Sequence, residues 1–283
     1  MSSPVIARTR VDLAAARALM PGQVAVVMTM GALHRGHVQL IDVARERGDS
    51  VLVTIFVNPL QFGAGEDLDR YPRTFGADVA ICADHGVDVV FAPAVADMYP
   101  PGEAVKQRHA GGLGERLEGA HRPGHFDGVL TVVALLLELT QPDLAIFGEK
   151  DAQQLALIRR MVAEDGIPTE IVGVPTVRED DGLALSSRNR YLSDAEREVA
   201  LAISRALRAG EAAAGYGADA ALAAARKVLD DAPGIDLDYV ELVDEQTWER
   251  PSEKTREGRI LVAGRVGKTR LIDNVSVVLG TQH

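Results

Sequence analysis

The feature that most constrains the fold is an alternation of short apolar runs with amphipathic segments. The runs are rich in Val and Ile and carry few charges, and they lie at residues 23–30, 50–57, 87–93, 143–148 and 169–175. Such runs are typical of strands that helices bury on both faces. The segments between them repeat apolar residues at helical spacing, at residues 38–48, 74–86, 126–140 and 151–166. The alternation predicts an α/β fold with a doubly wound, Rossmann-like parallel sheet.

The sequence changes character after residue 176. A polar loop leads to Ser193 and Glu196, which have the spacing of a helix capping box. An alanine-rich helical stretch follows, and then three runs that suit antiparallel strands, at residues 235–244, 258–267 and 269–280. We therefore expect a larger Rossmann-like domain and a smaller C-terminal α+β domain, at residues 1–176 and 177–283.

Composition excludes several classes of protein. The net charge is −11, with 41 acidic and 30 basic residues, whereas a nucleic-acid-binding surface needs a basic stripe. Cys82 is the only cysteine, so no disulfide framework or thiolate metal cluster is expected, and its thiol should be buried and inert. The longest apolar stretch breaks at Glu138, too short to span a bilayer. We expect a cytoplasmic protein that binds neither nucleic acid nor membrane.

Polar residues suited to anion binding follow four of the predicted strands. His34 and His37 follow the first strand, Gln61 the second, Lys150 the fourth and Arg188 the fifth. In a sheet of this type, ligands bind at the carboxyl ends of the strands. Each group alone is typical of a helix cap, a turn or a surface ion pair. Together they predict a site for a phosphate-bearing ligand at this edge of the sheet.

The pattern of polar residues excludes some types of site but does not identify a single reaction. The sequence contains neither G-x-x-x-x-G-K-[ST] nor G-x-G-x-x-G, so a P-loop and a dinucleotide site are unsupported. No pair of nucleophile and base stands out. A site that holds polyphosphate by electrostatics favours nucleotidyl transfer. Two alternatives stay open, namely another nucleotidylyltransferase acting on a phosphorylated acceptor, and a regulatory module that binds ATP without chemistry.

The motifs also resemble a known family. The HxGH sequence at His34–His37 and the serine-rich basic loop resemble the nucleotidylyltransferase superfamily. More closely, seven ordered segments between Val24 and Val275 resemble the pantothenate synthetase (pantoate–beta-alanine ligase) family, and they read TMGALHRGH, IFVNPLQF, YPRT, RPGHFDGV, FGEKDAQQ, PTVREDDGLALSSRN and TRLIDN. The resemblance implies an AMP-forming acid–amine ligase that makes pantothenate. Pantoate would attack the α-phosphorus of ATP, and beta-alanine would then attack the pantoyl adenylate and release AMP.

The resemblance also implies roles for individual residues. It assigns catalysis to His37, as proton donor, and to His34, Lys150 and Arg188. Pantoate would contact Gln61 and Gln154, and beta-alanine would contact Gln61. The residues expected to bind ATP are Met30, Gly31, Ala32, Leu33, His34, Arg35, Gly36, His37, Gly148, Glu149, Lys150, Asp151, Val177, Leu185, Ser186, Ser187 and Arg188. Arg122 and His125 match further family positions near the active site.

The resemblance further implies Mg²⁺, with Asp78 near the metal and phosphate oxygens as its main ligands, and a homodimer. Three positions depart from the family pattern. Met28 stands where proline is usual, Leu185 where methionine is common, and Ala77 where relatives can carry a second acid. The last departure bears on the protein's contacts to the metal rather than on the reaction.

Overall fold

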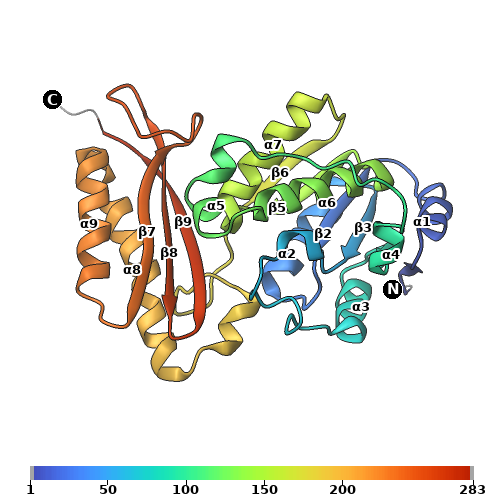
Figure 1. Ribbon diagram of the computed structural model, residues 1–283, viewed down its shortest axis with the longest axis horizontal. Coiled ribbons are helices and arrows are strands. Elements are labelled where there is room, and N and C mark those ends of the chain that lie inside the picture. Colours follow the sequence, from blue (N-terminus) through green and yellow to red (C-terminus); the bar gives the residue numbers. More distant parts are fainter. Residues whose placement is uncertain (1–2, 281–283) are drawn as a thin grey trace. The chain divides into compact units, whose positions relative to one another are not determined.

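The computed structural model describes residues 3–280 and divides into two compact units, Met1–Pro175 and Thr176–His283 (Figure 1). Within the described residues, the first unit holds a six-stranded sheet and the second a three-stranded sheet. Each unit has its own hydrophobic core. The predicted α/β class, with a doubly wound parallel sheet and a smaller α+β part, is confirmed.

The strands of the first unit are all parallel. They are β1 (Val5–Ala7), β2 (Val24–Thr29), β3 (Ser50–Ile55), β4 (Val89–Phe91), β5 (Leu144–Gly148) and β6 (Glu170–Val174). Their order across the sheet is β1-β4-β3-β2-β5-β6. Strand β3 lies on one side of β2 and β5 on the other, so the winding reverses at β2. The loops that follow β2, β3 and β5 therefore share one edge of the sheet.

Two details of this sheet differ from the sequence-based expectation. The run at residues 87–93 forms a strand only over Val89–Phe91, and β1 at Val5–Ala7 is not predicted at all. Both strands have three residues, and two of the three in β1 are exposed. Segments this short show no reliable period in the sequence. They pair with each other at the edge of the sheet.

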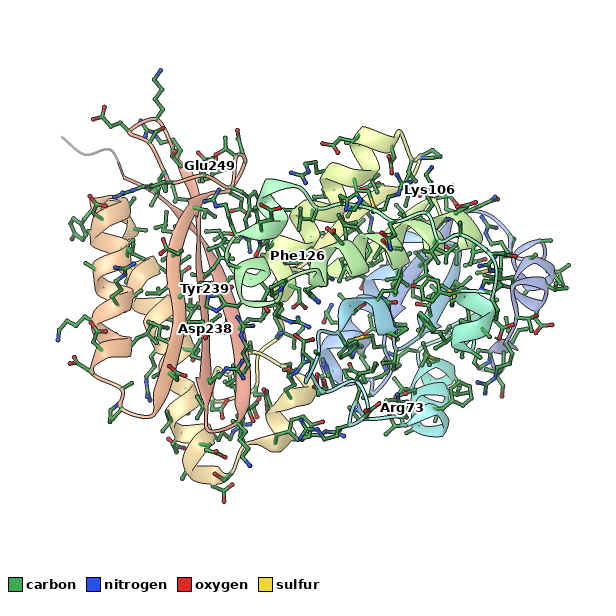
Figure 2. All side chains as sticks on the ribbon, in the orientation of Figure 1. Arg73, Lys106, Phe126, Asp238, Tyr239 and Glu249 are labelled. Atoms are coloured by element: carbon green, nitrogen blue, oxygen red, sulfur yellow. The ribbon has the colours of Figure 1, made fainter. Side chains whose placement is uncertain are left out.

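Helices cover both faces of the sheet. They are α1 (Arg10–Arg17), α2 (Arg35–Arg47), α3 (Phe75–Asp84), α4 (Val95–Met98), α5 (Glu118–His121), α6 (His125–Thr140) and α7 (Ala152–Asp165). One core joins Val24 and Val26 to α1, α6 and α7, and it includes Phe126 of α6, which is 3% exposed (Figure 2). The other joins Ala25 and Val27 to α2 and α3. Successive residues of β2 thus enter opposite cores, as a strand requires.

Cys82 lies in the second of these cores. Burial raises the pKa of its thiol to about 12, so the thiolate that would react is scarce at neutral pH. The expected burial of Cys82 is confirmed. Among residues 3–280, no helix is long and apolar enough to cross a membrane.

The second unit packs two helices on an antiparallel sheet. Its elements are α8 (Asp194–Ala213), α9 (Ala218–Asp230), β7 (Ile235–Asp244), β8 (Glu257–Val266) and β9 (Thr269–Val278). The capping box at the start of α8 is confirmed, since Ser193 Oγ accepts from the Glu196 N–H at 3.3 Å and the Ser193 N–H donates to Glu196 Oε2 at 2.8 Å. The three predicted antiparallel strands are confirmed as well.

Candidate active site

His34 and His37 form the capping box of α2. Nδ1 of His34 accepts a hydrogen bond from the Gly36 N–H at 3.1 Å, and Nδ1 of His37 accepts one from the His34 N–H at 3.3 Å. A neutral imidazole that accepts at Nδ1 carries its hydrogen on Nε2. The helix start therefore fixes the tautomer of both rings and keeps two Nε2–H donors beside a helix N-terminus, where anions are favoured.

The environment of His37 keeps its ring neutral. The two histidine rings lie 4.1 Å apart between centroids. The pKa of His37 falls from 6.5 to about 3, mainly because burial disfavours its charged form, and next because of His34. Asp151 raises this pKa and Lys150 lowers it, so both charges act on the ring. At neutral pH, His37 is therefore a hydrogen-bond donor and not a cation.

The loop after β5 brings Lys150 and Asp151 to the same edge as the histidines. Strand β5 pairs with β2 through Val27 and Ile146. A 3-10 turn, η3 (Glu149–Asp151), then leads into α7. Lys150 Nζ lies 3.8 Å from Asp151 Oδ1, and the lysine side chain is 22% exposed. The structure thus brings the HxGH and GEKD segments together, as expected from the strand order.

Gln61 is held by a chain of side chains from three segments. It ends the 3-10 turn η1 (Pro59–Gln61) after β3. Its Oε1 accepts from Asn58 Nδ2 at 3.0 Å, and its Nε2 donates to the sulfur of Met30 at 3.3 Å. Asn58 is 1% exposed, and its Oδ1 accepts from the Tyr99 hydroxyl at 2.8 Å. Met30 and Gln61, expected to bind different substrates, are therefore in contact.

Tyr99 is a positioning residue that the sequence pattern does not single out, and Asn58 is one whose role the pattern leaves open. Asn58 does follow a strand, but Asn before Pro is equally typical of an ordinary turn. Tyr99 comes from a segment with no motif. Gly128 of α6 completes the arrangement, because a Cβ there would lie 2.1 Å from the Leu60 carbonyl oxygen. Glycine allows α6 to approach η1 closely, and the Gly128 carbonyl accepts from Asn58 at 3.1 Å.

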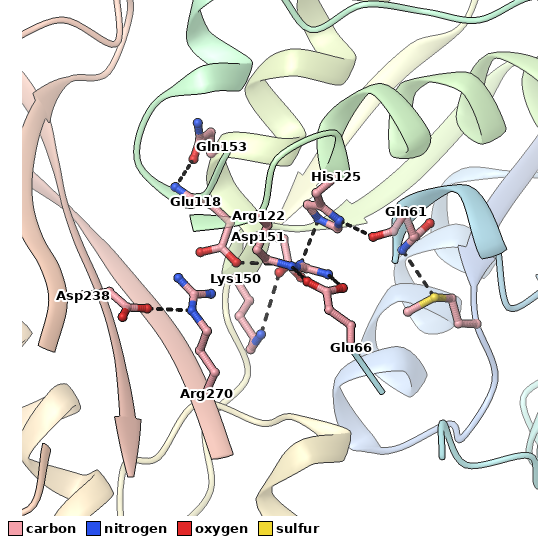
Figure 3. A network of polar contacts seen from close by, with 11 residues as sticks. Gln61, Glu66, Glu118, Arg122, His125, Lys150, Asp151, Gln153, Asp238 and Arg270 are labelled. Atoms are coloured by element: carbon pink, nitrogen blue, oxygen red, sulfur yellow. Dashed lines mark hydrogen bonds and ion pairs between the residues drawn. The ribbon is translucent and has the colours of Figure 1, made fainter. Parts of the chain in front are cut away.

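A second polar network joins Glu66 to Gln61 through Arg122 and His125 (Figure 3). The Arg122 guanidinium donates to both carboxylate oxygens of Glu66, each at 2.8 Å. It also lies 3.0 Å from His125 Nε2, while His125 Nδ1 lies 2.8 Å from the Gln61 carbonyl oxygen. Because the guanidinium only donates, His125 accepts at Nε2 and donates from Nδ1.

Hydrogen bonds, burial and charge in this network lower the pKa values of Glu66 and His125. Hydrogen bonds from Arg122 hold the pKa of Glu66 below its ordinary value. Burial, and then the charge of Arg122, lower the pKa of His125. Arg122 and Glu66 are 17% and 25% exposed. Sequence reasoning missed Glu66, since its partner is 56 residues away.

The neighbouring glutamines at the start of α7 have different environments. Gln153 is 4% exposed, its Nε2 donates to the carbonyl oxygens of Leu113 and Arg116, and its Oε1 accepts from the Glu118 N–H. It therefore fixes the segment that precedes α5. Gln154, the predicted pantoate contact, is partly exposed.

Asp78 lies in the first turn of α3 and is 1% exposed. Its Oδ2 accepts from the Ala32 N–H at 3.1 Å, and its Oδ1 accepts from the Leu33 N–H at 2.9 Å and from the Thr74 hydroxyl at 3.1 Å. Over residues 3–280, no group of three or more His, Cys, Asp or Glu side chains could hold a metal ion. The expected place of Asp78 near Mg²⁺ stays a prediction, and the hydrogen bonds observed are to the protein.

The second unit contains the remaining predicted residues. The Leu185 N–H donates to the Val177 carbonyl oxygen at 2.9 Å, which joins the predicted adenine contact to the serine-rich loop. Ser186 caps the 3-10 turn η4 (Ser187–Tyr191), because its hydroxyl accepts from the Arg188 N–H at 3.2 Å. Side chains 185–188 are all partly exposed. Val177 and Leu185–Arg188 therefore form one local structure within Thr176–His283.

Comparisons with known proteins decide the family. The pantoate-beta-alanine ligase family model matches residues 5–276. A pantothenate synthetase from Salinispora arenicola is 60% identical over 97% of this chain and 98% of its own length. This chain belongs to the pantoate–beta-alanine ligase family. The resemblance seen in the seven motifs is thereby confirmed.

Solved structures of the ligase family have the same fold. A pantothenate synthetase from Thermus thermophilus superposes with a TM-score of 0.91, at 48% identity, over 96% of this chain and 98% of its own. A pantoate–beta-alanine ligase from Francisella tularensis, crystallised with beta-gamma ATP and beta-alanine, has a TM-score of 0.80 at 36% identity, over 96% and 97%. The fold described above is therefore that of the ligase family.

Proposed function

We propose that this chain is the ligase that condenses pantoate with beta-alanine through a pantoyl adenylate, cleaving ATP to AMP and pyrophosphate. The observation that carries the proposal is the meeting of His37, Lys150 and Asp151 at the carboxyl edge of β2 and β5. Family membership across residues 5–276 supports the same reaction. The Francisella tularensis relative, which was crystallised with beta-gamma ATP and beta-alanine, supports the choice of substrates.

In the first step the pantoate carboxylate attacks the α-phosphorus and pyrophosphate leaves. Negative charge then grows on the β- and γ-phosphates, so donors fixed near them stabilise the transition state more than the ground state. We assign this to Lys150 and to the Nε2–H groups of His34 and His37. The family resemblance also assigns phosphate contacts to Ser186, Ser187 and Arg188.

The low pKa of His37 fits a proton donor whose proton arrives with its ligand. A ring with a pKa of about 3 carries no charge at neutral pH. Nearby phosphate charges favour the protonated form and raise this pKa. ATP binding should therefore bring proton uptake at His37, and the imidazolium can then donate as pyrophosphate leaves.

In the second step the amine of beta-alanine attacks the acyl carbon and AMP leaves. Gln61 and Gln154 would hold pantoate through neutral amides, which leave its carboxylate nucleophilic. The amide of Gln61 is oriented by Asn58 and Met30 before any substrate binds. Such preorganisation lowers the entropy cost of aligning the reacting groups.

The donor set does not fit a metal ion held by the protein. Asp78 already accepts three hydrogen bonds, and the described residues contain no other metal-ligating cluster. We therefore place Mg²⁺ on the phosphate oxygens of ATP, as the resemblance implies, and assign it no protein ligand. The homodimer and the cytoplasmic location stay predictions, which sedimentation and cell fractionation would test.

Isotope exchange tests the proposal. Labelled pyrophosphate should enter ATP when pantoate is present and beta-alanine is absent, because the first step needs no amine. With both acids present, the nucleotide product should be AMP. Formation of ADP, or exchange that requires beta-alanine, would exclude the adenylate mechanism. A chain that only binds ATP would give neither exchange nor AMP.

A further inference from the structure

We propose that Asp78 is a positioning residue, which fixes the backbone of residues 31–33 and thereby places His34 and His37, and that it is not a metal ligand. Its kinetic consequences rest on the function proposed above. The structural consequences of this role do not, because they concern hydrogen bonds within the chain itself.

The backbone before the histidines has an unusual shape. Gly31 has φ +83° and Ala32 has φ 50°, both in the left-handed region. Glycine adopts this region readily, whereas a residue with a Cβ occupies it only where its surroundings hold it there. Ala32 is 4% exposed. Something in the fold must therefore hold this turn, which ends at the helix cap His34.

Asp78 supplies that constraint. Its two oxygens accept from the N–H groups of Ala32 and Leu33, at 3.1 and 2.9 Å. Buried backbone N–H groups need partners, and a carboxylate is a strong one. The contact with Gly31 is also close, because a Cβ on that glycine would lie 3.1 Å from Asp78 Oδ2. The carboxylate thus lies against three consecutive residues of the turn.

The same geometry disfavours a metal at this carboxylate. Asp78 is 1% exposed, and Thr74 donates to it at 3.1 Å in addition to the two amides. A magnesium ion needs near-octahedral oxygen ligands and usually keeps several waters. The adjacent position is Ala77, which has no oxygen in its side chain. Three of the roughly four lone-pair positions of the carboxylate already accept hydrogen bonds, which leaves little room for an ion beside those that hold the turn.

The test compares Asp78→Asn with Asp84→Asn, which changes an exposed aspartate on the same helix. The two backbone N–H groups bond to different oxygens of Asp78, and an amide replaces one of these oxygens by an NH2 group that donates, so one N–H loses its acceptor. In Asp78→Asn, amide hydrogen exchange at Ala32 and Leu33 should accelerate at least about tenfold, the scale of losing one charge-assisted hydrogen bond. Turnover should fall at least about tenfold from the misplaced donors. The Mg²⁺ concentration for half activation should not change, and Asp84→Asn should match the parent chain.

A metal ligand would give the opposite result. The Mg²⁺ concentration for half activation would rise strongly, and saturating Mg²⁺ would restore turnover. Amide hydrogen exchange at Ala32 and Leu33 would stay normal. That outcome, or unchanged exchange and turnover, would overturn the proposal. If Asp78→Asn does not fold, Thr74→Val removes one donor to the same carboxylate and should produce a smaller change of the same kind. If the parent chain makes no pantothenate, the proposed function fails and the exchange result still decides the role of Asp78.

Discussion

The two regions predicted to contact ATP are held in place by different forces. The turn at residues 30–37 is fixed by backbone geometry, by the histidine caps of α2 and by one buried carboxylate. The segment at residues 177–188 is fixed mainly by charge. Arg178 donates to both oxygens of the buried Asp273, at 2.6 and 3.0 Å, and Arg197 pairs with Glu179 and Asp181 at 3.0 and 2.6 Å.

Because of this difference, the two regions should respond differently to salt and to the loss of a charged side chain. Hydrogen bonds between neighbouring backbone groups are insensitive to salt, whereas ion pairs at the surface weaken as salt rises. The first region should therefore keep its shape across conditions and control the chemical step. The second should respond to the loss of single charges, and its partly exposed Arg197 pairs should weaken with salt more than the buried pair of Asp273.

Removal of His37 should have the largest effect on the reaction. His37→Ala should lower turnover at least about a hundredfold, the scale of losing one donor to developing charge. The Kd for ATP should change much less, because the contact is strongest in the transition state, when negative charge grows on the leaving phosphates. Rapid-quench kinetics and ATP titration measure the two effects. His109→Ala, which changes an exposed ring, is the control, and near-normal turnover in His37→Ala would leave the histidine with a capping role only.

Removal of Lys150 should separate the two half-reactions. Lys150→Ala should slow adenylate formation on the order of fiftyfold, because the lysine ammonium is a compact positive charge that neutralises the charge developing on the leaving phosphates. The attack of beta-alanine on preformed pantoyl adenylate should change little, because no pyrophosphate leaves in that step. The exposed Lys106→Ala serves as control. Equal losses in both half-reactions would show that Lys150 supports the site as a whole.

Breaking the pair of Arg178 and Asp273 should destabilise the second region alone. Asp273 is 3% and Arg178 27% exposed as side chains, so Arg178→Met should cost about 2 kcal/mol, between the values for exposed and fully buried pairs. Urea unfolding measures this cost. Arg226→Met, in an exposed pair, should cost less than about 0.5 kcal/mol. Faster amide exchange at Ala32 in Arg178→Met would contradict the separation of the two regions.

The smallest effect concerns the ion pair between Arg122 and Glu66, in the network that reaches Gln61. The pKa of Glu66 lies below 4.5 because Arg122 donates to its carboxylate, so the pair stabilises the fold above about that pH. The stabilisation is lost as the pH falls through the folded-state pKa. Glu66→Gln should lower the free energy of unfolding by about 1 kcal/mol at neutral pH and by less in acid. Denaturant titrations at several pH values measure this. Glu164→Gln, in an exposed pair, is the control and should change the free energy of unfolding by less than about 0.5 kcal/mol at neutral pH.

Much of the fold follows from local pattern. The apolar runs predict β2, β3, β5 and β6 to within two residues at each end, because alternation and burial leave a period in the sequence. The capping box at Ser193 was predictable for the same reason, since its partners are three residues apart. The sequence also predicts that the polar residues lie at the carboxyl edge of the sheet, because ligands of parallel α/β sheets bind there.

The contacts that orient the site were not predictable in this way. Tyr99 reaches Asn58 across 41 residues, Arg122 reaches Glu66 across 56, and Asp78 reaches Ala32 across 46. Contacts between residues so far apart leave no recognisable spacing in the sequence. The same holds for Gln153 and Gln154, which are identical and adjacent, yet only the first is buried.

The sequence alone therefore determined the class of fold, the elements and the types of residue that follow each strand, because these depend on interactions within a few positions along the chain. The tertiary structure decided what those residues do. It made His37 a neutral donor, oriented the rings of His34 and His37 through their Nδ1 atoms, joined Gln61 to Met30, and turned Asp78 toward backbone amides. The physical reason is that pKa values and hydrogen-bond partners depend on burial and on groups brought near by the order of the strands.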